Sequence, residues 1–302
     1  MRKMAVIGLG HVGATVAYTL VSQGIADELV LIDTNEKKVV AEKLDFEDAM
    51  PRLPYHVEIK TQDYAELKDA DVIITAFGDI DASVRTGNRF AEFEINTKNA
   101  VEVGKKIKES GFSGVIIDIS NPCDAVTSIL QETTGLPRNQ VLGTGTFLDT
   151  ARMQHVVGDA LGQDGRNVEG FVLGEHGNSQ FVAWSTVRVN NKPITEFFTE
   201  EELEELGKKP AEGGFKVANG KGYTSYAIAT CGVKLAQAVL SNAHFFGPVS
   251  TYVEEVGTYV GYPAIVGAKG VEKVVPLVLT DEEKAKLEQS ANYIKEHLDS
   301  LK

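Results

Sequence analysis

The chain has little cysteine: Cys123 and Cys231 are its two cysteines in 302 residues. Two thiols so far apart in the sequence are too few for a disulfide scaffold or for a zinc site with four ligands. This scarcity is typical of a reducing compartment, so we expect a cytoplasmic location. The sequence also lacks any run near the roughly 18 apolar residues that a membrane span needs. Glycines interrupt the apolar run that follows Arg2 and Lys3, so we expect neither a signal peptide nor a membrane partner.

Positive charge is also scarce, because 30 lysines and arginines face 43 aspartates and glutamates and leave a net charge of −13. Such an excess of negative charge argues against a protein built to hold nucleic acid. Hydrophobic residues make up 43% of the chain and charged residues 24%, which are globular proportions. At roughly 150 residues per domain, the length favours two domains with buried cores.

The first half of the chain alternates short β-branched runs with longer amphipathic segments. This pattern predicts strands over residues 4–8, 29–33, 56–60, 71–77, 115–120 and 141–144, and helices over 11–24, 36–50 and 90–110. Alternation of this kind is typical of a doubly wound parallel α/β sheet with helices on both faces. Ligands of such sheets lie at the carboxyl ends of the strands. We expect this domain to span residues 1–145.

The second half changes to an α+β pattern, which we expect to form a second domain over residues 146–302. A capping box at 280–283 opens the last helix, whose apolar residues recur at Leu287, Ala291, Ile294 and Leu298. A charged segment at 199–209 precedes a glycine-rich stretch. The other predicted elements are helices over 147–161 and 223–242 and strands over 168–173 and 181–189.

A glycine motif, Gly8-x-Gly10-x-x-Gly13, stands between the first predicted strand and the first predicted helix. These glycines permit a tight turn, close approach of backbone to a pyrophosphate, and close packing of helix on strand. Asp33 ends the second predicted strand, where its carboxylate can accept hydrogen bonds from ribose hydroxyls. An acidic residue there would repel a 2′-phosphate, so the motif favours NAD over NADP. The alternative is a glycine-rich turn with Asp33 as a strand-end cap.

Three residues of the second half can carry proton transfer and anion binding. His176 stands between glycines after an apolar strand, where an imidazole is accessible near neutral pH. Asp149 and Arg152 are three residues apart, so both point to one side of the predicted helix. The carboxylate could orient the imidazole while the guanidinium grips a substrate carboxylate. A turn histidine and a surface ion pair are the alternatives.

The chain as a whole resembles the L-lactate and malate dehydrogenases and the related L-2-hydroxyisocaproate dehydrogenases. The likeness runs from the glycine motif to the last helix, and it implies a Rossmann sheet followed by an α+β substrate domain. It also implies NAD as the cofactor and a homodimer or homotetramer. The motifs that carry it, besides the glycine motif, are Asn121-Pro122-Cys123-Asp124, Gly143-Thr144-Gly145-Thr146 and Lys221-Gly222-Tyr223-Thr224-Ser225.

The resemblance implies a role for each site residue in hydride transfer between nicotinamide and a 2-oxo or 2-hydroxy acid. His176 would donate and accept the proton, Asp149 would orient the His176 imidazole, and Arg152 would clamp the substrate carboxylate. Arg89 would polarise the substrate carbonyl. It follows residues 83–88, a segment that the family uses as a closing lid. No metal is implied. The remaining expected contacts are Asn121 with nicotinamide ribose or substrate, Thr224 in the substrate pocket, and Gly8, Gly10, Gly13 and Asp33 with the cofactor.

The lid segment bears on the choice of hydroxy acid. It lacks the R-K-P pattern with a second arginine that malate dehydrogenases carry, so Arg85 is interpreted as a solvated lid charge. Its small and apolar residues suit an uncharged side chain. Residues 86–92 and 174–187 look most like the hydroxyisocaproate branch, which predicts branched or medium aliphatic substrates. The alternative is a non-allosteric lactate dehydrogenase, ahead of a malate dehydrogenase.

The resemblance also bears on regulation. Bacterial lactate dehydrogenases that fructose bisphosphate activates carry an arginine and a histidine where this chain has Gln154 and Glu169. Neither residue can bind phosphate as a cation, which predicts no activation by fructose bisphosphate.

The residues present argue against two other classes of protein. An NAD-dependent glycosidase would need a divalent metal held by cysteine and histidine, and Cys123 has no obvious second ligand. We expect Cys123 to be a small buried hydrophobe. A non-catalytic NAD-sensing module would have lost its proton-transfer groups, whereas Arg89, Asp149, Arg152 and His176 are all present.

Overall fold

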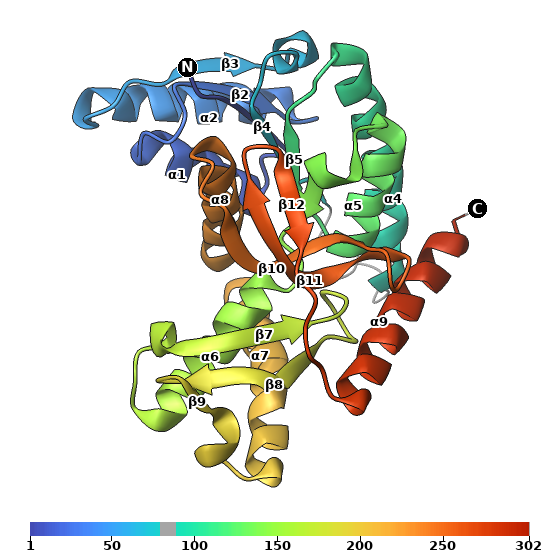
Figure 1. The fold of residues 1–302 in the computed structure, drawn as a ribbon. Helices are drawn as coiled ribbons and strands as arrows, with labels where there is room; N and C mark the ends of the chain where they lie inside the picture. The colour runs from blue at the N-terminus through green and yellow to red at the C-terminus, as the bar shows by residue number, and fades with distance from the viewer. Residues whose placement is uncertain (79–88, 302) are drawn as a thin grey trace.

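Six parallel strands form the centre of the molecule in the order β3-β2-β1-β4-β5-β6 (Figure 1). The computed structural model describes residues 1–78 and 89–301, with the backbone alone at 89–91. The strand order is that of a doubly wound dinucleotide-binding sheet, so the predicted fold class is confirmed. The strands are β1 (Lys3–Ile7), β2 (Glu28–Ile32), β3 (Glu58–Thr61), β4 (Val72–Thr75), β5 (Val115–Asp118) and β6 (Val141–Gly143).

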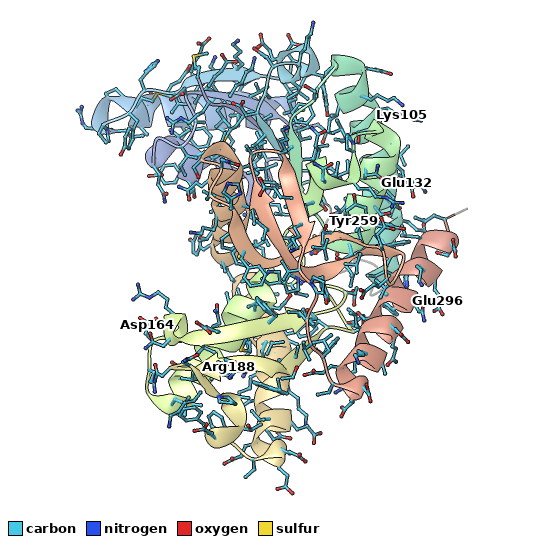
Figure 2. The ribbon with its side chains drawn as sticks, in the orientation of Figure 1. Lys105, Glu132, Asp164, Arg188, Tyr259 and Glu296 are labelled. Atoms are coloured by element: carbon cyan, nitrogen blue, oxygen red, sulfur yellow. The ribbon has the colours of Figure 1, made fainter. Side chains whose placement is uncertain are left out.

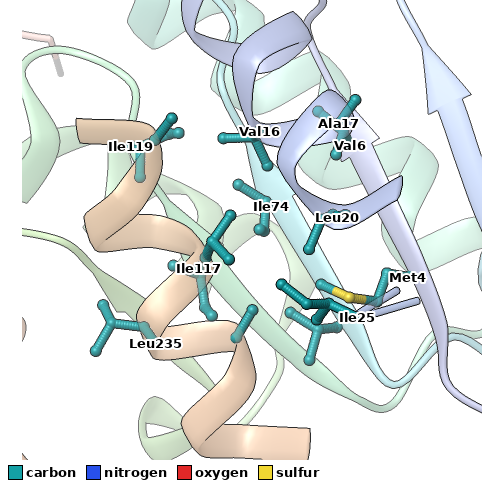
Figure 3. Packing of buried hydrophobic residues seen from close by; sticks show 14 of the residues in the cluster. Met4, Val6, Val16, Ala17, Leu20, Ile25, Ile74, Ile117, Ile119 and Leu235 are labelled. Carbon is teal, nitrogen blue, oxygen red and sulfur yellow. The ribbon is translucent and has the colours of Figure 1, made fainter. Parts of the chain in front are cut away.

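Helices cover both faces of this sheet, which is why its central strands are continuously apolar. One face carries α1 (His11–Ser22), α2 (Glu36–Ala49) and α8 (Tyr226–Leu240); the other carries α4 (Arg89–Ser110) and α5 (Cys123–Thr134) (Figure 1). Figure 3 shows Val16 and Leu20 of α1 packed with Ile74, Ile117 and Leu235. Helix α5 was not predicted from the sequence. Short 3-10 turns lie at Met50–Arg52, Tyr64–Leu67, Arg138–Gln140, Gly165–Asn167 and Ile194–Glu196.

Three antiparallel strands from the second half extend the same sheet beyond β6. They are β10 (Phe245–Val253), β11 (Thr258–Gly267) and β12 (Gly270–Val274), and β10 joins β6 where Ser250 pairs with Gly143. None of the three was predicted. Strands β10 and β11 are buried on both faces, so neither shows the alternation that marks a half-buried strand. Figure 2 labels Tyr259 of β11, whose hydroxyl donates to the backbone oxygen of Arg138 at 3.2 Å.

The rest of the second half forms a smaller antiparallel sheet with two helices. Strands β7 (Val168–Leu173), β8 (Phe181–Val189) and β9 (Lys192–Pro193) pack with α6 (Phe147–Leu161) and α7 (Glu200–Lys221). Most of the glycine-rich stretch lies within α7, which was not predicted, and the predicted helix over 223–242 is α8, with bounds Tyr226–Leu240. A Thr199–Glu202 capping box and buried leucines stabilise α7 despite its glycines.

The last helix, α9 (Asp281–Asp299), begins at the predicted Thr280–Glu283 capping box. Its buried residues include the predicted Leu287, Ala291 and Ile294, and the helix packs on α5 and β11 (Figure 1). This position brings the apolar side of α9 to the carboxyl ends of the parallel strands. Among the described residues, no helix is both long enough and apolar enough to cross a membrane.

Candidate active site

The glycine motif forms the loop between β1 and α1, as predicted. Gly8 has a φ of +94°, and a Cβ there would lie 2.6 Å from the backbone of Ala76. A Cβ on Gly13 would lie 1.8 Å from the backbone oxygen of Gly8, so only glycine allows α1 to approach the loop. A Cβ on Gly10 would have no neighbour within 4 Å, and no side chain caps α1. The loop therefore offers open space and backbone N–H groups to an anion.

Asp33 follows β2 and contacts the glycine loop directly. Its Oδ2 accepts a hydrogen bond from the backbone N–H of Leu9 at 2.6 Å, and its Oδ1 accepts from Asn35 at 2.8 Å. The carboxylate thus caps the strand end, which was the alternative interpretation. It also stands beside the loop, where a ribose would meet it in the expected role.

His176, Asp149 and Arg152 lie together. The Nδ1 of His176 is 2.6 Å from Oδ2 of Asp149, whose Oδ1 accepts from Nη1 of Arg152 at 2.9 Å. The Asp149 side chain is 1% exposed, whereas Arg152 and His176 keep 21% and 23% of their side-chain surface exposed. A buried carboxylate between two partly open cations is not a surface ion pair. The arrangement leaves both cations able to meet a small anion.

The backbone on either side of His176 is fixed by contacts that the sequence analysis did not predict. Gly174, just after β7, exchanges two backbone hydrogen bonds with Gly261 of β11 at 3.1 and 3.0 Å. The N–H of His176 donates to Oδ2 of Asp124 at 2.8 Å, and Asp124 Oδ1 accepts from Ser250 at 2.5 Å. Asp124 belongs to the motif Asn121-Pro122-Cys123-Asp124, but no local pattern pairs it with Ser250.

The charges around His176 favour its protonated form. Burial is the largest single influence and lowers the pKa of His176, but the charge and hydrogen bond of Asp149, with the charge of Asp124, outweigh it and raise that pKa to about 9. Burial likewise opposes ionisation of Asp149, yet its contacts with His176 and Arg152 hold its pKa below the usual value. The pair is therefore an imidazolium held by a carboxylate at neutral pH.

Asn121 and His176 line one cavity of about 440 Å³. Asn121 follows β5, and its backbone oxygen accepts from Nδ2 of the buried Asn96 at 2.6 Å. Helix α4 contributes Phe93 to the cavity, and α9 contributes Tyr293 among others. The lining residues are Glu92, Phe93, Asn121, Pro122, Asp124, Ala125, Glu175, His176, Gly177, Asn178, Tyr293, Ile294 and His297.

The remaining predicted residues are Thr224, Arg85 and Arg89. Thr224 is half-buried in the loop between α7 and α8 and does not line that cavity, but its neighbour Tyr223 stacks on His11 of the glycine motif with ring centroids 3.6 Å apart. The loop of Thr224 therefore lies beside the cofactor loop. Arg85 and the side chain of Arg89 lie outside the described residues; the backbone of Arg89 begins α4.

Cys123 is buried, and burial raises the pKa of its thiol well above the ordinary value. The predicted burial of this small side chain is confirmed. In the part of the chain that the structure describes, no group of three or more His, Cys, Asp or Glu residues could hold a metal ion.

A nucleotide-type parallel sheet with its phosphate loop, joined to a histidine–carboxylate–arginine set, defines a dinucleotide-dependent oxidoreductase. Residues 2–143 match the family model described as lactate/malate dehydrogenase, NAD binding domain. Residues 146–302 match the model of the lactate/malate dehydrogenase alpha/beta C-terminal domain. The chain belongs to the lactate/malate dehydrogenase family, whose members are NAD-dependent oxidoreductases acting on the CH–OH group of 2-hydroxy acids.

Named relatives cover nearly the whole chain. L-lactate dehydrogenase 1 of Bifidobacterium longum subsp. longum is 37% identical over 310 residues, covering 99% of this chain and 98% of the relative. The ligand-bound crystal structure of minor L-lactate dehydrogenase from Enterococcus mundtii has a TM-score of 0.94 at 34% identity, covering 100% of this chain and 98% of that one. A malate dehydrogenase from Salinibacter ruber has a TM-score of 0.90 at 28% identity, with 99% and 97% covered.

Proposed function

We propose that this enzyme reversibly reduces 2-oxo acids with branched or medium aliphatic side chains to L-2-hydroxy acids. The observation that carries the chemistry is the buried Asp149 carboxylate between His176 and Arg152. Because an ionised Asp149 can only accept, Nδ1 of His176 carries a proton and Nε2 is the nitrogen left for proton exchange. His176 donates that proton to the substrate oxygen during reduction and takes it back during oxidation.

The neighbouring residues bind and polarise the substrate. Arg152 pairs with the substrate carboxylate, for which its planar guanidinium provides parallel N–H donors. Arg89, from the start of α4, polarises the carbonyl as negative charge develops. Asn121 contacts the nicotinamide ribose or the substrate, and Thr224, which lies outside the cavity shared by Asn121 and His176, reaches the substrate from the loop beside the cofactor loop. NAD, when bound, supplies the hydride acceptor or donor, and the open space at Gly10, the free start of α1 and the carboxylate of Asp33 fit its pyrophosphate and ribose.

The preference for an aliphatic side chain is supported by the cavity beside His176. Phe93, Ala125 and Ile294 give it an apolar side. Among its described lining residues there is no lysine or arginine to pair with the second carboxylate of oxaloacetate, and Glu92 is acidic. A volume of about 440 Å³ exceeds what a methyl group needs. Both features favour 2-oxoisocaproate over oxaloacetate and pyruvate.

The test is a panel of 2-oxo acids with NADH, followed by absorbance. We expect kcat/KM to be highest for 2-oxoisocaproate, lower for pyruvate and lowest for oxaloacetate. A Phe93→Ala variant should alter the ranking among aliphatic substrates without weakening NADH binding, whereas Val278→Ala, at an exposed position outside the cavity, serves as a control. A highest kcat/KM for oxaloacetate would overturn the substrate assignment.

We also propose a cytoplasmic homodimer or homotetramer with a cofactor domain over residues 1–145 and a catalytic domain over 146–302. Four large apolar side chains on or beside α1 and α2 expose about half of their surface: Tyr18 51%, Val40 55%, Leu44 55% and Tyr55 48%. Such surfaces favour a partner subunit. Light scattering on the purified protein and on Leu44→Glu would show an assembly in the first and a smaller species in the second.

A further inference from the structure

We propose that Asp124, anchored by Ser250, is a positioning residue for the reaction and holds the proton-transfer loop against the nicotinamide side of the cleft. This rests on the proposed function of His176. Asp124 takes no part in the proton transfer or the substrate binding proposed for this site. The residue acts through His176 and does not itself touch the substrate.

Three distant segments of the chain meet at this one carboxylate. Asp124 belongs to the first turn of α5, three residues after Asn121, and is 1% exposed. Its Oδ2 accepts from the backbone N–H of His176 at 2.8 Å, and its Oδ1 accepts from the hydroxyl of Ser250 in β10 at 2.5 Å. Since Asn121 and His176 line the same cavity, the carboxylate fixes the spacing between its two sides.

Geometry alone does not require a charge at this position. An asparagine could accept from the His176 N–H through its oxygen and donate to Ser250 through its amide. A buried carboxylate is costlier to keep than such an amide. Burial raises the pKa of Asp124 to about 6, so the group is largely ionised at neutral pH. Its charge serves the imidazolium of His176, the residue whose backbone N–H donates to it.

The other ionisable groups around His176 come from helices α4, α6 and α9 and from the loop after β7. Asp149 and Arg152 of α6 act on it directly, in opposite directions. The Glu175 carboxylate is taken up by Asn178 and Ser179, from which it accepts three hydrogen bonds. The cavity also receives ionisable side chains from α4 and α9, namely Glu92, Tyr293 and His297. Asp124 is therefore the second carboxylate, after Asp149, that raises the pKa of His176.

The experiment compares Asp124→Asn, Ser250→Ala and the control Asp118→Asn with the wild type. The control also neutralises a buried carboxylate, but one that has no contact with His176. The measurements are kcat/KM against pH in both directions with 2-oxoisocaproate or pyruvate, the Kd of NADH from fluorescence, and Tm.

For Asp124→Asn we expect the pH limb due to His176 to move down by about one unit, because a favourable negative charge is lost. Reduction at pH 8.5 should then fall about threefold, and about tenfold only at a pH above both limbs, with the Kd of NADH within about twofold of wild type. Ser250→Ala keeps the charge, so its limb should stay in place while kcat falls severalfold. Asp118→Asn should leave the limb unmoved.

An Asp124→Asn enzyme with the wild-type limb and kcat would overturn the proposal and leave Asp124 a structural residue. If Asp124→Asn does not fold, Ser250→Ala decides, and a wild-type kcat in that variant overturns the positioning role. Failure of the proposed function itself is distinguishable, since the wild type would then reduce none of the 2-oxo acids.

Discussion

At the scale of single residues, the guanidinium of Arg152 depends on a glycine in a different helix. A Cβ at Gly214 of α7 would lie 3.1 Å from Nη2 of Arg152 and 3.2 Å from its Cζ. Any side chain there would push the guanidinium by a few tenths of an ångström. The glycine-rich character of α7 therefore has a reason at Gly214, whereas a Cβ on the adjacent Gly213 would meet nothing within 4 Å.

Gly214→Ala should raise the KM for the 2-oxo acid severalfold, an effect on the order of 1 kcal/mol, because a small displacement misaligns the carboxylate clamp. Gly213→Ala is the matched control, with an unchanged KM. Both substitutions favour the helix, so neither should lower Tm. Steady-state kinetics with saturating NADH measure this. Equal KM values in the two variants would show that Arg152 does not hold the substrate.

Local sequence patterns predict some contacts between the site residues and miss others. Asp149 and Arg152 share one helix, so their spacing alone predicts that they lie together. His176 stands out by its flanking glycines and the strand before it. Asp124 and Ser250 are 126 residues apart and meet only because β10 joins β6, so no local pattern could pair them. Gly214 likewise has meaning only once α6 and α7 are packed.

At the scale of elements, the glycines of the β1–α1 unit serve two purposes, the fold and the binding of the cofactor. Gly8 and Gly13 are needed for the fold, since a Cβ on either would collide with backbone. Gly10 has a φ of −62°, which any residue adopts, and open space around its missing Cβ. Its glycine serves the ligand and not the turn.

Gly10→Ala should therefore keep Tm within about 1 °C while weakening NADH binding by about tenfold or more, as a methyl group occupies the space for the pyrophosphate. Gly13→Ala should lower Tm by several degrees, because α1 must move off the loop. Thermal unfolding without cofactor, together with NADH fluorescence titration, separates the two. Gly10→Ala with wild-type affinity would place the cofactor elsewhere.

Several elements with apolar residues at regular spacing were predicted with their observed bounds. The helix at 147–161 and the strands at 168–173 and 181–189 have the predicted bounds, since each carries apolar residues at regular spacing. Helix α5 was not predicted although its apolar residues gather on one side, so its absence from the prediction has no cause in its periodicity. Strands β10 and β11 were missed because both of their faces are buried. Helix α7 was missed because glycine is normally unfavourable inside a helix.

At the scale of the whole molecule, stability depends on a carboxyl buried in the centre of the large sheet. Asp118 ends β5 and is 0% exposed; Thr75, Ser120 and Thr127 donate hydrogen bonds to it. Burial outweighs those donors and raises the pKa of Asp118 to about 7. Because the folded pKa lies above the ordinary 3.8, this group favours folding fully below pH 3.8. That contribution is lost as the pH rises through about 7.

Asp118→Asn should thus raise the free energy of unfolding at pH 8 by about 2 kcal/mol, since an amide avoids the buried charge and can donate to Thr127. The gain should shrink steadily towards pH 4. Asp27→Asn is the opposite control, because hydrogen bonds from Arg2 lower the pKa of the Asp27 carboxyl to about 2. This substitution should lower the free energy of unfolding at pH 8, and the loss should shrink on acidification. Urea unfolding at several pH values measures both. A gain for Asp118→Asn that grows on acidification would contradict the assigned cause.

The most direct test of the proton-transfer assignment is the pH dependence of kcat/KM in both directions on one enzyme preparation. As the pH increases, kcat/KM for reduction of the 2-oxo acid should decline and kcat/KM for oxidation of the hydroxy acid should rise. Both changes should follow a single shared ionisation well above 6.5 and near 9. In His176→Gln both limbs should vanish and both rates should fall by about 10²–10⁴-fold. A His176→Gln enzyme that retains the wild-type limbs would contradict the assignment of His176 as the proton donor and acceptor.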